Sequence, residues 1–123
     1  MKYSYNYLVI KLTLLNFNNI KLTSLQENIL NELSTDIDAD KICKKFNIKR
    51  ITLSKIIKTL GAKNLYFNGQ LTSLGKKMVH YIKFRNETIS AFLKLSNIKE
   101  TDDIKNQMHH LDYKVIIALK NIC

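Results

Sequence analysis

The near absence of helix-breaking residues constrains this chain more than any other feature of its sequence. None of its 123 residues is proline and three are glycine, and these two residue types interrupt helices most strongly. Hydrophobic residues make up 46% of the chain, a share that supports a packed core. The length fits one compact domain, alone or with an added arm. We therefore predict a mainly α-helical fold.

Apolar residues recur with the period of amphipathic helices along most of the chain. The predicted helices cover residues 23–33, 39–46, 49–60, 72–95, 101–110 and 112–122. Thr23 or Ser24 is suited to cap the first helix, and Asn47 closes the second because asparagine tolerates the left-handed backbone found at helix ends. Before residue 23, tyrosines alternate with polar residues as in a strand, but residues 7–17 are apolar enough for a buried helix. Periodicity leaves both open there.

A short hairpin is predicted directly after the helix at 49–60. The dipeptide Asn68-Gly69 separates the β-prone runs 65–67 and 70–72. This dipeptide suits a two-residue turn, because both of its residues readily adopt the positive φ that such a turn requires.

The two short helices at 39–46 and 49–60 match the spacing of a helix-turn-helix, and a hairpin that follows such a unit is a wing. We therefore predict a winged helix-turn-helix domain over residues 23–72. A helical dimerisation region follows over residues 73–123. Residues 1–22 form an N-terminal extension, a strand or a helix, whose part in a dimer stays open.

Positive charge is concentrated in one stretch of the chain. The whole chain carries 20 basic and 10 acidic residues, for a net charge of +10, whereas residues 39–67 hold eight basic residues and one acidic residue, for +7. Focused positive charge attracts polyanions through the release of condensed counterions. A solvated lysine-rich face has the same composition, so composition alone does not decide between the two.

The helix predicted at 49–60 has two chemically different faces. Its apolar face consists of Leu53, Ile56, Ile57 and Leu60. The opposite face carries long cations and small hydroxyls, namely Lys49, Arg50, Thr52, Lys55, Lys58 and Thr59. Such side chains contact phosphates, and Arg or Lys also binds guanine edges, so this face suits the DNA major groove. The wing adds Asn68 and Gln70, with Lys63 close to it.

Several short motifs between residues 23 and 122 carry a family resemblance. They are Thr-Leu-Ser at 52–54, Leu-Thr-Ser-Leu-Gly-Lys-Lys at 71–77, Phe-Arg-Asn-Glu at 84–87, Phe-Leu at 92–93 and Met-His-His-Leu at 108–111. In order and spacing they resemble the manganese- and iron-dependent repressors, the family of the diphtheria toxin repressor and the manganese transport regulator. The resemblance implies a homodimeric, winged transcriptional repressor that binds double-stranded DNA. It also implies that Lys49, Arg50, Thr52, Ser54 and Lys55 face the DNA.

The metal-ligand pattern that this resemblance implies is incomplete in the chain. Asn86 and Met108 stand where the pattern has a histidine and a glutamate, and Lys105 stands where it has a carboxylate. Glu27 and His109 remain as weak metal candidates, and two ligands do not make a selective divalent site. We therefore expect a regulator that needs no metal and no other cofactor.

Two alternatives remain open. Residues 22–26 and the Leu-Thr-x-x-Gly pattern at 71–75 also resemble the multiple-antibiotic-resistance regulators. Those are dimeric winged repressors, and this reading implies a small-molecule effector or none. A winged domain can also serve as a protein-interaction module. DNA binding is favoured over protein interaction if the wing is free and the outward side chains include Lys49, Arg50 and Lys55.

Catalysis finds no support in the sequence. No carboxylate pair, nucleophile with a base, or glycine-rich phosphate loop falls on a plausible pocket. Cys43 and Cys123 are too few for a disulfide framework or a zinc finger, and Cys43 occupies an apolar helical position where a buried free thiol is expected. The apolar run at 7–15 contains Lys11 and lacks a following cleavage site, and no stretch reaches the roughly 20 apolar residues of a membrane span. We expect a cytoplasmic protein that is not an enzyme and has no membrane partner.

Overall fold

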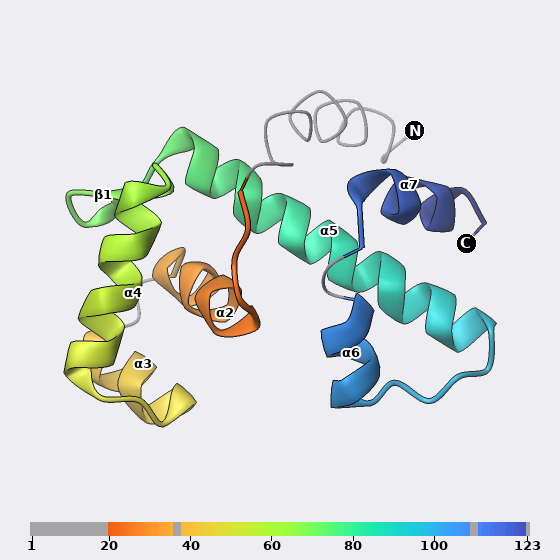
Figure 1. Ribbon diagram of the computed structural model, residues 1–123, viewed down its shortest axis with the longest axis horizontal. Helices are drawn as coiled ribbons and strands as arrows, with labels where there is room; N and C mark the ends of the chain where they lie inside the picture. The colour runs from red at the N-terminus through yellow and green to blue at the C-terminus, as the bar shows by residue number, and fades with distance from the viewer. Residues whose placement is uncertain (1–19, 36–37, 109–110, 123) are drawn as a thin grey trace. The chain divides into compact units, whose positions relative to one another are not determined.

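The computed structural model describes residues 20–35, 38–108 and 111–122, and these residues form a mainly α-helical structure with one small antiparallel hairpin (Figure 1). Its elements are α2 (Ser24–Leu33), α3 (Ala39–Phe46), α4 (Arg50–Ala62), β1 (Tyr66–Phe67), β2 (Gln70–Leu71), α5 (Ser73–Leu95), α6 (Asp102–Met108) and α7 (Tyr113–Ile122). The mainly α fold with a hairpin is thus confirmed. An N-terminal extension was predicted over residues 1–22, and residues 1–19 of it lie outside the described residues. None of the described helices is long and apolar enough to cross a bilayer.

Local capping explains where the first helices begin. The hydroxyl of Thr23 accepts a hydrogen bond from the backbone N–H of Gln26 at 3.1 Å, and the Gln26 side chain accepts one from the N–H of Thr23 at 3.0 Å. This capping box satisfies two helix-end donors and selects Thr23, rather than Ser24, as the cap. Asp38 caps α3 through the N–H of Lys41 at 2.9 Å.

Asparagine ends three of the helices. Asn47, Asn64 and Asn97 have φ of 52°, 61° and 58° and follow α3, α4 and α5. In each case the next N–H donates back to a carbonyl five residues earlier, from Ile48 to Cys43, Leu65 to Leu60 and Ile98 to Leu93, at 2.8 to 3.0 Å. This is the Schellman arrangement, which usually uses glycine. In a chain with three glycines, asparagine takes that position because it tolerates the left-handed backbone.

The chain divides within α5 into two compact units, one of which spans Leu22–Val79. In this unit α4 contacts α2, α3 and β1. The fully buried side chains that form its core are Ile29, Leu30, Ile42, Leu60 and Leu65. They come from α2, α3, α4 and the segment before β1, so α4 lies at the centre of the packing.

The other unit contains the chain from His80 in α5 onward, with α6 and α7, and also the chain up to Lys21. Ile89 and Leu93 of α5 and Ile116 of α7 form its buried cluster. Partly buried side chains surround the cluster, namely Phe84, Phe92, Ile104, Met108, Leu111 and Leu119. The expected helices at 101–110 and 112–122 are present as α6 and α7, except that residues 109–110 lie outside the described residues.

One glycine is required by close packing. A Cβ atom on Gly75, in the first turn of α5, would lie 2.0 Å from the carbonyl oxygen of Leu65. Leu65 is fully buried and its carbonyl also accepts the N–H of Thr72 at 3.1 Å. Only a residue without a side chain lets α5 approach the backbone this closely.

We expect Gly75→Ala and Gly61→Ala to change stability in opposite directions. The first forces a Cβ into a backbone carbonyl and should lower the free energy of unfolding by about 2 kcal/mol or more. The second places a Cβ in ordinary contact, 3.5 Å from the Tyr66 carbonyl oxygen, within α4. It should raise the free energy of unfolding by up to about 1 kcal/mol, because alanine favours helix. Urea unfolding followed by circular dichroism measures both, and equal effects would contradict the packing described.

Candidate nucleic-acid interface

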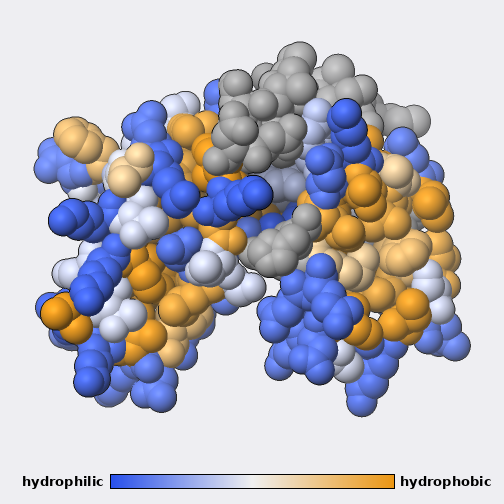
Figure 2. Space-filling view, in the orientation of Figure 1, coloured by the Kyte–Doolittle hydropathy of each residue, from blue (hydrophilic) through white to orange (hydrophobic). Residues whose placement is uncertain are grey.

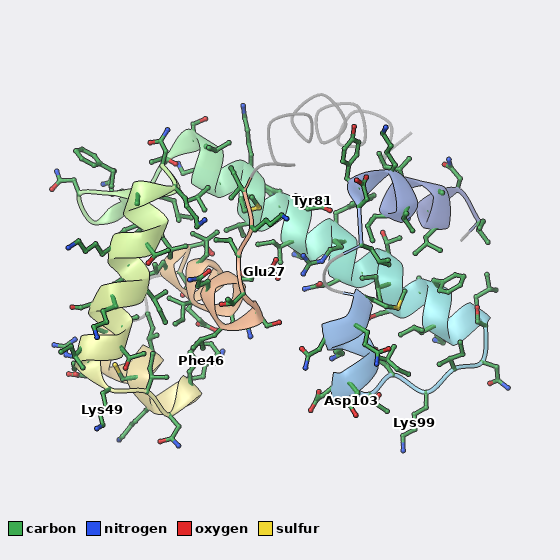
Figure 3. All side chains as sticks on the ribbon, in the orientation of Figure 1. Glu27, Phe46, Lys49, Tyr81, Lys99 and Asp103 are labelled. Carbon is green, nitrogen blue, oxygen red and sulfur yellow. The ribbon has the colours of Figure 1, made fainter. Side chains whose placement is uncertain are left out.

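The outward face of α4 carries most of the predicted site residues. Arg50, Ser54, Lys55 and Lys58 are exposed on the helix, and Lys49 is exposed just before its first residue. Figure 3 shows Lys49 at the end of α4 that adjoins α3. Thr52 is half-buried. The helical pattern predicted these cations on the outward face, and they are exposed, as is Ser54, which only the family resemblance had suggested.

The orientation of this face follows from what α4 buries. Leu53 and Leu60 are 2% and 0% exposed, and Ile56 is also buried. Because a helix repeats every 3.6 residues, burial of this stripe turns the side of Lys55 and Lys58 away from the core. Ile57, the remaining residue of the predicted apolar stripe, is half-buried.

Two cations of the charged stretch are paired within the unit. Lys45 forms an ion pair with Glu32 of α2, whose side chain is buried, and its ammonium group lies 5.8 Å from the centroid of the Phe46 ring. A buried carboxylate needs such a partner, so Lys45 serves the fold. The Nε atom of Arg50 lies 3.6 Å from the Oδ1 atom of Asp40. Both side chains are exposed, and such a surface pair contributes little and exchanges readily with another anion.

The remaining cations of α4 are unpaired within the described part of the chain. No described carboxylate lies within ion-pair distance of Lys49, Lys55 or Lys58. The first turn of α4 holds no acidic residue, and its N-cap, Lys49, makes no side-chain hydrogen bond. The uncapped N–H groups and the helix dipole therefore add to the positive potential at this end.

The hairpin after α4 has the predicted geometry. Tyr66 pairs with Leu71 and Phe67 with Gln70, and the turn residues Asn68 and Gly69 have φ of 52° and 81°. Both central residues thus have the positive φ that a type I′ turn requires. Asn68 and Gln70 are exposed, as expected for the tip of a wing, and the predicted Lys63 is half-buried before β1.

Two exposed apolar residues, on α4 and on the hairpin, were not among the predicted site residues. Ile51 is 63% exposed in the first turn of α4, and Phe67 is 76% exposed in β1. Ile51 does not belong to the apolar stripe of α4. Its position outside that stripe could have predicted that it lies on the outward face. Alternation within β1 could have separated Phe67 from the half-buried Tyr66.

Of the two candidate metal residues, only Glu27 lies in the described part of the chain. Glu27 is buried in α2, and His109 lies outside the described residues. Among the described residues, no three His, Cys, Asp or Glu side chains are grouped so as to hold a metal ion. Lys105, which replaces a carboxylate of the resembled pattern, has its Nζ atom 3.8 Å from Oε1 of Glu100. Cys43 is a free thiol, half-buried rather than fully buried as expected.

No known family model, curated protein or solved structure matches this chain significantly. The function is therefore inferred from the residues and their arrangement.

Proposed function

We propose that this chain is a winged helix-turn-helix protein that binds double-stranded DNA through the outward face of α4. The observation that carries the proposal is the set of exposed lysines on that face, Lys49, Lys55 and Lys58, with no carboxylate partner among the described residues. An unpartnered cationic face on a packed helix is what the phosphate backbone binds.

The local architecture supports this proposal. α3 and α4 contact each other, and the turn between them is tightened by the left-handed Asn47. A second helix that packs on one face and is solvated on the other is the part of a helix-turn-helix that enters the major groove. The β1–β2 hairpin follows α4 directly and corresponds to the wing. Lys49, Arg50 and Lys55 are exposed, which favours DNA over a partner protein as the ligand.

The side chains of the face divide into two roles. Lys49, Lys55 and Lys58 neutralise phosphates and position the helix. Arg50, once released from Asp40, has the geometry to bind a guanine edge, and Ile51 offers an aliphatic surface of the kind that contacts a thymine methyl group. Sequence preference therefore depends on Arg50 and Ile51, and general affinity depends on the lysines.

We further propose that the protein acts as a homodimer with a repressor-like role. Among the described residues from His80 onward, four large hydrophobic side chains are exposed: Leu95, Ile98, Val115 and Ile122. Figure 2 shows hydrophobic residues gathered over α5 and α7. A contact between two copies would bury them, and a dimer binds two half-sites about one helical turn apart.

A glutamate at Val115 is expected to convert the dimer to monomers, because the charge would be buried at the contact. Sedimentation equilibrium of the wild-type chain and of Val115→Glu measures this. A wild-type chain that sediments as a monomer at micromolar concentration would remove the dimer from the proposal and leave DNA binding by the single chain.

Removing one phosphate contact should flatten the salt dependence of DNA binding. With a duplex selected from a random pool, the slope of log K against log salt concentration should fall in magnitude by about 1 for Lys55→Ala or Lys58→Ala. Ile51→Ala should leave that slope unchanged while lowering the preference for the selected sequence. Fluorescence anisotropy over a salt series measures both quantities.

Lys94→Ala is the matched control, because Lys94 is an exposed lysine on α5 in the other unit. It should leave affinity and slope as in the wild type. If the Lys55 and Lys58 variants behave as the Lys94 variant does, α4 is not the DNA-binding helix. If the wild type binds no duplex even at low salt, the proposed function is wrong.

A further inference from the structure

The exposed aromatic ring of Phe67 at the hairpin tip is unexplained by the fold. Phe67 is the most exposed of the large hydrophobic side chains in the described part of the chain, at 76%. Its strand neighbour Tyr66 is half-buried and pairs with the half-buried Leu71, whereas Phe67 pairs with the exposed Gln70. The hairpin therefore has an inner pair that packs and an outer pair, Phe67 and Gln70, that faces solvent.

The hairpin offers a ligand no charge. Residues 64–71 contain no acidic or basic side chain. At the tip, a Cβ on Gly69 would have no atom within 4 Å, so the space around the turn is open. Contact through this hairpin must therefore use the phenyl ring and the amides of Asn68 and Gln70, because it cannot use cations.

These groups match the chemistry of the DNA minor groove. Proteins that bind this groove use asparagine and glutamine to reach the acceptors on its floor, and insert apolar side chains such as phenylalanine between base pairs. The unstacked step bends away from the wedge, most easily at pyrimidine–purine steps. We propose that Phe67 inserts at a base step in the minor groove, and that Asn68 and Gln70 bind the groove edge beside it.

This inference rests on the proposed DNA binding by α4, and the position of the hairpin is compatible with it. α4 has 13 residues, which is roughly 20 Å of helix, and the hairpin contacts α4 and follows its C-terminal end. Half of a DNA helical repeat, the step from a major groove to the next minor groove, is about 17 Å. With the first turn of α4 in the major groove, the hairpin reaches the neighbouring minor groove.

Two fluorescence measurements on the full chain and its selected duplex test this wedge. Energy transfer between dyes at the duplex ends reports bending, and 2-aminopurine placed at successive steps reports unstacking. The wild type should bend the duplex and raise the fluorescence at one step. Phe67→Ala should abolish both effects and weaken binding by roughly tenfold to a hundredfold.

Two further variants make the result specific. Phe67→Leu keeps an apolar wedge and should retain part of the bend. Tyr66→Phe changes the aromatic residue on the inner side of the same strand and should match the wild type. Because Phe67 is exposed, its variants should unfold at the wild-type urea concentration, which separates loss of the wedge from loss of the fold.

Three outcomes would count against the inference. If the wild type binds and Phe67→Ala bends and binds as the wild type does, the wedge is wrong while the proposed function stands. If Phe67→Ala weakens binding without any change in bending or unstacking, the ring contacts DNA without insertion, and the wedge is again overturned. If Phe67→Ala instead weakens self-association of the DNA-free chain, the ring belongs to a protein contact. Failure of the wild type to bind any duplex would overturn the proposed function itself.

Discussion

Burial of one side of α4 is the constraint on which the rest of the Leu22–Val79 unit depends. Leu53, Ile56 and Leu60 of α4 are buried, and α4 contacts α2, α3 and β1. Because the helical repeat couples the two faces, the packing that stabilises the unit also fixes the direction of Lys55 and Lys58. The Asn64 turn then returns the chain to Leu65, where Gly75 lets α5 pack closely. The proposed DNA-binding face is thus a direct consequence of how the core packs.

Local signals predicted the helices and the hairpin. The scarcity of glycine and proline, a cap at Thr23 or Ser24 and the Asn68-Gly69 turn all act over a few residues, so the sequence could indicate them, although only the structure selects Thr23 as the cap. The contact of Gly75 with the Leu65 carbonyl could not be, because it joins residues ten apart through tertiary packing. Asparagine often adopts a left-handed backbone after a helix, so Asn64 could have been predicted to do so. The helix was expected to end at residue 60, however, and α4 ends at Ala62, so Asn64 was not recognised as the residue that follows it.

The sequence predicted which side chains of the candidate site point outward, but it did not predict which of its cations form ion pairs. Helical periodicity placed Lys49, Lys55 and Lys58 outward, as found. It gave no sign that Lys45 pairs with the buried Glu32, or that Asp40 lies beside Arg50. These pairs join different helices, and only the packing of α2, α3 and α4 brings them together. The exposure of Ile51 and Phe67 likewise depends on what the neighbouring elements leave uncovered.

We propose that the outward face of α4 is the surface that binds DNA. Titration of the ¹⁵N-labelled chain with a duplex, followed by backbone amide chemical shifts, tests it most directly. We expect the largest shifts at residues 49–58 and in the β1–β2 hairpin, with smaller shifts in α6. Shifts concentrated in α6 and α7, or no shifts at low salt, would contradict it.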